Sequence, residues 1–506
     1  MHAPAARACY PAPMARTHPD ARTLPLLAPL ALAAGCGGAT EPAPEGVSET
    51  LGRVPVVLVV FDALNSEHLG HLGYDRDTSP NLDAFAAEAV SFRHGFSPAP
   101  YTLAGIASLL TGKLPDRHGL VDKALRLRDD ERTLAEILRD AGYPSKAVVG
   151  NPNGGAAFGA ADGFDEFVPL YLAGDGREVN YVNPHSGKEL HLARAEEFPP
   201  HLESFLDGLE DPAAPWFFYG HVLEPHTPYL APDPWREMFL DPEYAGPMLE
   251  GDDDPLIGHL HGDFDLTAED MQATIDLYDG NIAYADQGFG QLMDVLKQRG
   301  LYEDALILVT ADHGEAMFQH GTWGHNYSVF DEMVQVPLLV RLPGAADDGR
   351  PRGQVRDELV SIMDLVPSVC QWLDLAPPDE LDGYSLAPLL AGTEDEATFA
   401  ERFLHLRTHS TPPTLGLRHL HQKVVVERTK DPEVSELGFA TSFYDLVADP
   451  EEQSPLLEGE DPRVRAAREV LRAQAAALKA SFKGTQDATF TEEEADMMGA
   501  LGYSDD

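Results

Sequence analysis

The stretch "VPVVLVVFDA", residues 54–63, decides the fold. It is a continuous apolar run rich in valine, which is typical of a strand buried on both faces of a parallel sheet. The run ends in an acidic residue, Asp62. Because ligand sites of open parallel sheets lie beyond the carboxyl ends of the strands, Asp62 stands where a functional site is expected.

Similar apolar runs recur along the chain, with helical patterns between them. The runs are "SKAVVG" (145–150), "PWFFYGHV" (215–222), "DALILVTADHG" (304–314) and "VQVPLLVRL" (334–342). The helical patterns are residues 79–92, 132–142 and 267–300. This alternation predicts an α/β fold with a mostly parallel central sheet flanked by helices.

The last hundred residues have a different pattern. Residues 414–429 and 441–456 indicate short strands joined by turns, and residues 461–482 indicate a charged amphipathic helix. We therefore expect a catalytic domain over 53–395, a small C-terminal α+β subdomain over 396–485 and an acidic tail over 486–506.

The N-terminus predicts export. Three arginines precede "LPLLAPLALAAG" (24–35), an apolar segment that is too short to span a bilayer but suits a signal peptide over residues 1–35. Small residues before Cys36 resemble a bacterial lipobox, which would make Cys36 the lipidated first residue, followed by a flexible tether over 36–52. The alternative is a secretory signal cleaved nearby, with Cys36 incidental. The first interpretation places the protein at the cell envelope, periplasmic or surface-exposed, with a lipid anchor as its membrane contact.

Charge limits the partners. Asp and Glu outnumber Lys and Arg 84 to 36, giving a formal charge of −48. Such a surface repels a polyanion, so nucleic acid is excluded as a partner. An anionic substrate has to be attracted by a local cation, such as a bound metal ion. The acidic segment 241–265 is interpreted as a solvated loop rather than as a cation site.

Two apolar strands end in metal-ligating residue types. Asp62 ends the first, while Asp312 and His313 follow the strand in "LILVTADHG". Because the carboxyl ends of parallel strands share one edge of the sheet, these side chains are predicted to bind one divalent cation. Carboxylate and imidazole donors leave Zn, Mn, Mg and Ca open.

Thr102 begins a short run of small and apolar residues, "TLAGIASLLTG", that ends at Gly112. Its hydroxyl could simply cap a helix. A helix N-terminus is also an anion site, and a metal beside it would make Thr102 a nucleophile. His226 and His325 lie in clusters after strand ends and are predicted to contact the anionic group and protonate the leaving group; His221 and His320 are weaker candidates.

In order along the chain, these segments resemble the sulfatase family within the alkaline phosphatase superfamily. The resemblance rests on residues 56–119, "HVLEPHTPY", "VTADHGE", "HGTWGH", "FYDLVADPEEQ" and the terminal "ALGY". It implies that Asp62, Asp312 and His313 bind the metal ion together with the nucleophile Thr102, and that His226 and His325 contact the anionic ester.

The departures from that family pattern concern the chemistry. Residues 102–106 are TLAGI, so the Cys or Ser that sulfatases convert to formylglycine is absent, and no formylglycine is expected. The adjacent Asp pair is reduced to Asp62 and Ala63, and Asn151 and Asn153 stand where the family has Lys and His. A formylglycine hydrate expels sulfate by collapsing to an aldehyde, but a threonine ester cannot. It has to be cleaved by direct attack of water, which favours phosphate over sulfate esters. The alternative is a degenerate lipoprotein that binds an anionic glycan or lipid head group without turnover.

Overall fold

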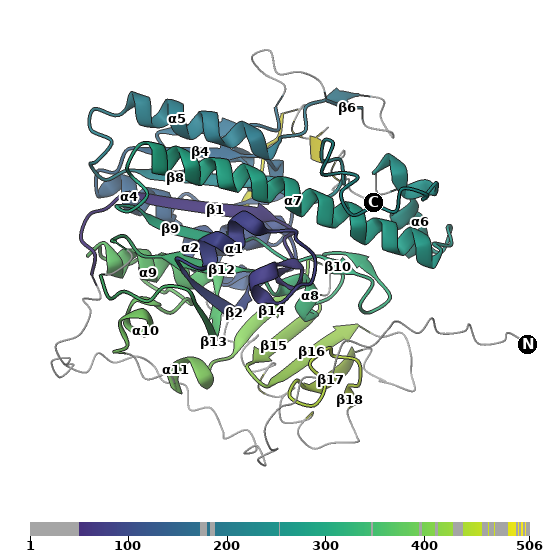
Figure 1. The fold of residues 1–506 in the computed structure, drawn as a ribbon. Helices are drawn as coiled ribbons and strands as arrows, with labels where there is room; N and C mark the ends of the chain where they lie inside the picture. The colour runs from purple at the N-terminus through teal and green to yellow at the C-terminus, as the bar shows by residue number, and fades with distance from the viewer. Residues whose placement is uncertain are drawn as a thin grey trace, which may run out of the picture. The chain divides into compact units, whose positions relative to one another are not determined.

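A computed structural model shows the protein in Figure 1. It describes residues 50–172, 180–182, 188–251, 254–345, 348–393, 397–409, 413–428, 439–457 and 484–491, with isolated residues between 464 and 501. The predicted signal peptide over 1–35, Cys36 and most of the helix predicted over 461–482 lie outside the described residues.

The first sheet has eight strands, and the expectation of a mostly parallel α/β sheet is confirmed. Strand β12 is antiparallel to both neighbours, and all other pairs are parallel. The spatial order is β13 (Gln354–Ser361), β2 (Val90–Phe96), β12 (Leu338–Arg341), β9 (Leu306–Ala311), β1 (Val56–Asp62), β8 (Phe217–Pro225), β4 (Ser145–Val149) and β5 (Glu166–Pro169).

The sequence patterns missed three of these strands. The helical pattern over 79–92 is too long: helix α1 covers Pro80–Ala86, and β2 begins at Val90. Strand β13 includes exposed polar residues because it lies at an edge of the sheet, and β5 lies at the other edge. An edge strand has only one covered neighbour and does not need a continuous apolar run.

Two groups of helices flank the sheet (Figure 1). The longest, α7 (Ala268–Gln298), contacts β8, α1 and α5 (Phe198–Gly208). In the other group, α2 (Thr102–Thr111) contacts α9 (Leu365–Trp372) and α4 (Leu134–Asp140). Among the described residues, no helix combines the length and the apolar character needed to cross a membrane.

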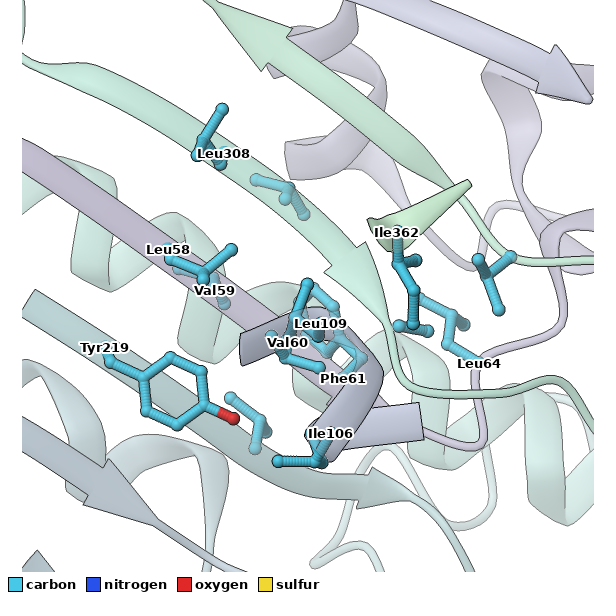
Figure 2. Close-up of a cluster of buried hydrophobic side chains, with 14 of the residues drawn as sticks. Leu58, Val59, Val60, Phe61, Leu64, Ile106, Leu109, Tyr219, Leu308 and Ile362 are labelled. Atoms are coloured by element: carbon cyan, nitrogen blue, oxygen red, sulfur yellow. The ribbon is translucent and has the colours of Figure 1, made fainter. Parts of the chain in front are cut away.

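Burial of β1 between these layers explains its valine-rich sequence. Every residue of the strand is buried. Figure 2 shows Leu58 and Val60 of β1 in one apolar cluster with Ile106 and Leu109 of α2, and these residues belong to the main core. The core therefore fixes α2 against the strand that carries Asp62.

A second sheet forms in the C-terminal region. Its five antiparallel strands are β14 (Leu404–Arg407), β15 (Leu415–His419), β16 (Gln422–Arg428), β17 (Phe439–Asp445) and β18 (Leu456–Leu457). Lys423 of β16 is fully buried and ion-pairs with Asp331 at 2.7 Å and Glu452 at 2.8 Å. Because Asp331 starts helix α8 (Asp331–Val334), this buried pair joins the second sheet to the residues that follow β11 (Trp323–Gly324).

Part of the segment expected as an acidic tail packs onto the first domain. Strand β19 (Gln486–Asp487) pairs with β3 (Leu125–Arg126). Farther on, the Phe490 ring centroid lies 5.2 Å from that of Phe158. These contacts place Gln486 and Asp487 against β3, which follows α3 (Pro115–His118), and Phe490 against Phe158.

Gly105 sets the distance between α2 and β9. A Cβ atom added at Gly105 would lie only 2.3 Å from the main-chain oxygen of Asp312. We expect Gly105→Ala to lower the free energy of unfolding by about 1–3 kcal/mol, because the helix must move away from the strand end. Chemical denaturation measures this loss.

Gly208→Ala is the matched control for that variant. Gly208 is the last residue of α5, and no atom lies within 4 Å of a Cβ added there. Alanine is the better helix former, so this variant should be as stable as the wild type or slightly more stable. Equal stability of the Gly105→Ala and Gly208→Ala variants would contradict the close approach.

Candidate active site

Two buried carboxylates meet at the carboxyl ends of β1 and β9. The strands are adjacent and parallel, so Asp62 at the end of one lies near Asp312 just after the other. One oxygen of Asp312, Oδ1, accepts hydrogen bonds from the backbone N–H groups of Ala63 at 3.2 Å and His313 at 2.8 Å. Its second oxygen, Oδ2, is buried and has no hydrogen-bond partner. The turn after each strand thus orients Asp312, with one oxygen left unsatisfied.

His221 faces the same carboxylates from strand β8. Its Nε2 lies 3.4 Å from Asp62 Oδ2 and 3.8 Å from Asp312 Oδ2, and all three side chains are fully buried. Neither ring nitrogen of His221 has a hydrogen-bond partner. Among the described residues, Asp62, His221 and Asp312 form the one group of acidic and histidine side chains close enough to hold a metal ion.

His313 adds a further imidazole. Its Nε2 lies 3.5 Å from Asp62 Oδ1 and 3.6 Å from Asp312 Oδ2. Its Nδ1 lies 2.8 Å from the carbonyl oxygen of Gly314, which can only accept, so Nδ1 carries the proton. Burial holds the pKa of His313 well below its usual value. The neutral ring therefore presents the lone pair of Nε2 to the carboxylates.

The donor set fits a divalent cation. Burial and the neighbouring charge of Asp62 raise the pKa of Asp312 well above its usual value, because two carboxylates cannot both ionise in this buried place without compensation. A cation between them removes that conflict and satisfies the buried atoms that lack hydrogen bonds. Two carboxylates and two imidazoles are good ligands for a divalent metal ion, whereas the two buried carboxylates repel each other when both are ionised.

Thr102 faces this cluster from the start of α2. It is the first residue of the helix, while Tyr101 occupies the N-cap position without a side-chain cap. The Thr102 Oγ1 atom lies 3.4 Å from Asp62 Oδ1 and 3.2 Å from His313 Nε2. The hydroxyl is thus beside the candidate ligands and at a helix N-terminus that favours an anionic group.

His325 and His226 lie next to the cluster. The ring centroid of His325 is 4.3 Å from that of His313 and 5.1 Å from that of His226. His226 is held by its Nδ1, 2.6 Å from the carbonyl oxygen of Thr227, and burial lowers its pKa. The structure brings together Asp62, Thr102, His226, Asp312, His313 and His325, which were predicted from the sequence.

A buried glutamate distinguishes His325 from its neighbours. The carboxylate of Glu315 lies 3.2 Å from His325 Nδ1. Burial alone lowers the pKa of His325, but the charge and hydrogen bond of Glu315 outweigh it and raise the pKa above its usual value. A protonated His325 has an Nε2–H to donate. His325 is therefore the better candidate for a general acid, because its pKa is raised whereas burial lowers that of His226.

His320, a weaker candidate, and Asn151, a departure from the family pattern, have different surroundings. His320 contacts Glu332 at 2.6 Å and stacks on Phe330 with ring centroids 3.7 Å apart, so it belongs to the junction with the second sheet. Asn151 instead enters the site: its Nδ2 donates to Asp62 Oδ2 at 2.5 Å. The described part of the acidic insertion 241–265 contains no comparable group of ligands.

Comparison with known proteins identifies the family of the chain. The sulfatase family model matches residues 55–375. The chain belongs to the sulfatase family. A second model, the C-terminal region of N-sulphoglucosamine sulphohydrolase, matches residues 319–480. The family resemblance predicted from the sequence is therefore confirmed, and with it membership in a class of hydrolases that act on sulfuric and phosphoric esters.

Relatives within the sulfatase family are distant but cover most of the chain. A choline-sulfatase of Rhizobium meliloti is 26% identical over 450 residues, covering 81% of this chain and 83% of that protein. A multifunctional alkaline phosphatase superfamily protein, PehA, of Trinickia caryophylli is 25% identical and covers 67% of this chain and 77% of its own length. The crystal structure of a phosphonate monoester hydrolase of Agrobacterium radiobacter has a TM-score of 0.66 at 23% identity, covering 85% of this chain and 96% of that one.

Three residues of this sulfatase-family site were missed or ranked low from sequence. His221 was a weaker candidate, expected after the strand, whereas the structure places it inside β8. Glu315 follows Asp312 by three residues in "DHGE", and that spacing was its only signal. Lys123 lies in a loop with no motif, yet its charge acts on His325 and lowers that pKa. Lys123 is thus a positive charge close enough to His325 to affect its pKa.

Glu315→Gln should weaken acid catalysis by His325. We expect kcat/KM to fall by about 10–100-fold for alkyl esters and much less for esters of acidic phenols, because good leaving groups need no proton. The measurement is the dependence of kcat/KM on the pKa of the leaving group. It uses a series of phosphate or sulfate esters, whichever class the wild type hydrolyses. A steeper dependence in the variant is the expected result.

Glu332→Gln is the matched control, because Glu332 holds His320 in a buried pair of the same kind away from the cluster. Its leaving-group dependence should equal that of the wild type, even if its stability falls. If both variants or neither steepen the dependence, the assignment of the acid to His325 is wrong.

Proposed function

We propose that the protein is a metal-dependent hydrolase of phosphate monoesters or diesters that works through a covalent Thr102 intermediate. The observation that carries the proposal is the position of Thr102 Oγ1, 3.4 Å from Asp62 and 3.2 Å from His313, at the N-terminus of α2. Sulfate esters are the second substrate class, supported by the names of the sulfatase relatives.

The residues support a two-step reaction. The ionised Thr102 oxygen attacks phosphorus, the bond to the ester oxygen breaks, and His325 gives its proton to the departing alkoxide. A water then loses a proton to His325 and attacks the phosphothreonine, releasing phosphate and regenerating the Thr102 oxygen. The N-terminal N–H groups of α2 and the side chain of Lys123 stabilise the negative charge on the non-bridging oxygens. His226, kept neutral by burial, accepts a hydrogen bond from a protonated substrate oxygen or orients the water.

A divalent metal ion, when bound by Asp62, Asp312, His313 and His221, supplies the positive charge that favours the ionised Thr102 and neutralises the ester. Neighbouring residues orient the ligands and place Thr102 beside them. Asn151 donates to Asp62 Oδ2 and so fixes the rotation of that carboxylate. Gly105 lets α2 approach closely enough for Thr102 to face both strand ends.

The choice of phosphoryl over sulfuryl transfer follows from the nucleophile. Threonine cannot form the aldehyde that expels sulfate from a formylglycine hydrate, so the ester of Thr102 has to be cleaved by direct attack of water. The likeness in fold to the phosphonate monoester hydrolase and the relation to the multifunctional protein PehA are consistent with phosphorus chemistry.

The proposed place of action is the cell envelope. Export is inferred from the signal-like residues 1–35, and anchoring from the lipobox-like sequence before Cys36. Globomycin treatment of cells that express the chain should cause the precursor to accumulate, and Cys36→Ser should release the protein from membranes. A Cys36→Ser protein that still sediments with membranes would exclude the anchor.

Thr102 should become covalently modified during turnover. After brief exposure of the metal-loaded protein to aryl phosphate, phosphodiester and sulfate esters and an acid quench, we expect a mass gain of one phosphoryl group on the peptide that contains Thr102. Intact-protein and peptide mass spectrometry measure it. Thr102→Ser should keep the adduct, and Thr102→Ala should lose it together with about 10³-fold or more of kcat.

A sulfuryl adduct in place of a phosphoryl adduct would assign the sulfate substrate class instead. An adduct at another residue, or full hydrolysis by Thr102→Ala, would contradict the nucleophile. No adduct and no released alcohol with any metal ion would favour a protein that binds an anionic glycan or lipid head group without turnover.

A further inference from the structure

Ala63 leaves the metal cluster one carboxylate short. It follows Asp62 directly, where the resemblance to the sulfatase family implies a second aspartate, and its backbone is left-handed with φ 59°. Alanine is uncommon in this conformation, whereas Asp and Asn adopt it more readily. The turn therefore keeps a conformation suited to an acidic residue while it lacks the acid. Its N–H still donates to Asp312 Oδ1 at 3.2 Å.

His221 approaches the carboxylates from the other side of Asp62. It pairs in register with Val60 of β1 and Val149 of β4, so it is held in the middle of the sheet rather than on a loop. The chain at Gly154 packs against the back of its ring, since a Cβ added there would lie 2.6 Å from Nδ1. Only Nε2 is left facing Asp62 and Asp312.

The lack of hydrogen bonds to the buried imidazole of His221 favours a bound cation. His221 is fully buried, and neither ring nitrogen has a hydrogen-bond partner. A buried polar group without a hydrogen-bond partner is destabilising, so a histidine fixed in that state on a central strand has no structural benefit. The buried Oδ2 atom of Asp312, which also lacks a hydrogen-bond partner, lies 3.8 Å from it. A single ion would satisfy both atoms.

The spacing of the donors agrees with one small ion. Ligands at about 2.1 Å from a tetrahedral zinc ion lie about 3.4 Å apart. The distances from the two histidine Nε2 atoms to the carboxylate oxygens are 3.4, 3.5, 3.6 and 3.8 Å. Calcium prefers six to eight oxygen ligands, which this pair of carboxylates and pair of imidazoles does not provide.

We propose that His221 is a metal ligand that takes the place of the carboxylate missing at Ala63, and that this exchange makes the site selective for a zinc-class transition ion over calcium. The inference rests on the metal site of the proposed function and deepens it. It concerns binding of the ion and does not depend on which ester is hydrolysed or on the role of Thr102.

The test is direct metal binding by the chelator-treated full-length protein. Titrations with Zn²⁺, Mn²⁺ and Ca²⁺, read by calorimetry and by metal content after dialysis, should give one Zn²⁺ per chain, bound at least about 100-fold more tightly than Ca²⁺. Co²⁺ is the spectroscopic probe, because its visible absorption changes with the number of nitrogen ligands. His221→Ala should weaken Zn²⁺ binding by about 30-fold or more and alter the Co²⁺ spectrum, while Ca²⁺ binding changes little.

Two further variants separate a ligand from a merely structural residue. Ala63→Asp in the His221→Ala background returns a carboxylate, so it should restore binding but shift the preference toward Ca²⁺ and Mn²⁺. His94→Ala is the matched control: His94 is a partly buried histidine of the same sheet whose Nδ1 also has no hydrogen-bond partner, and it should bind Zn²⁺ like the wild type.

The outcomes distinguish this inference from the proposed function. Wild-type preference for Ca²⁺, or unchanged Zn²⁺ affinity and Co²⁺ spectrum in His221→Ala, would overturn the role of His221 and leave a metal-dependent hydrolase intact. A wild type that binds no divalent ion would overturn both. If His221→Ala does not fold, the wild-type selectivity and Co²⁺ spectrum still decide the choice of ion.

Discussion

Two carboxylates buried side by side are the constraint on which the rest of the site depends. Asp62 and Asp312 are fixed by adjacent parallel strands that have no freedom to separate, because every residue of β1 is buried between helical layers. Among the residues that the structure describes, the groups that face them are imidazoles, an amide and a hydroxyl. A divalent ion bound between them would remove this repulsion without protonation of Asp312, so the fold provides a place suited to a metal ion.

Helix α2 places the Thr102 hydroxyl and a helix N-terminus beside the two carboxylates. A glycine at position 105 allows the helix to pack against the main chain of Asp312, and the apolar side chains Ile106 and Leu109 hold it on β1 (Figure 2). The helix N-terminus then points its N–H groups toward the same place as Thr102 Oγ1. The proposed nucleophile, a helix N-terminus and the two buried carboxylates lie together because one close contact between a helix and a strand positions all three.

The sequence patterns predicted the strands and site residues that a local run of residues identifies. They missed the strands and site residues whose role depends on neighbours in space. Continuous valine-rich runs identified the central strands, and residues following them identified Asp62, Asp312 and His313. Edge strands β13 and β5 were missed because an edge carries no such run. His221 was ranked low because its meaning comes from two neighbouring strands: alone it is a polar residue in an apolar stretch, and only the register with Val60 and Val149 brings it to the carboxylates. Lys123, in a loop without a motif, could not be found from the sequence at all.

The negative charge of the chain means that an anionic ester has to be bound by positive groups close to it. The chain carries a formal charge of −48, which repels an anionic ester at long range. Salt screens that repulsion beyond about 10 Å at 0.1 M ionic strength, so only charges close to the ester can bind it. The positive groups of the proposed mechanism, Lys123, a protonated His325 and a metal ion, would act within that range. Recognition therefore depends on contact with the site rather than on electrostatic steering, and a small ester can reach it where a long polyanion would still face the acidic surface.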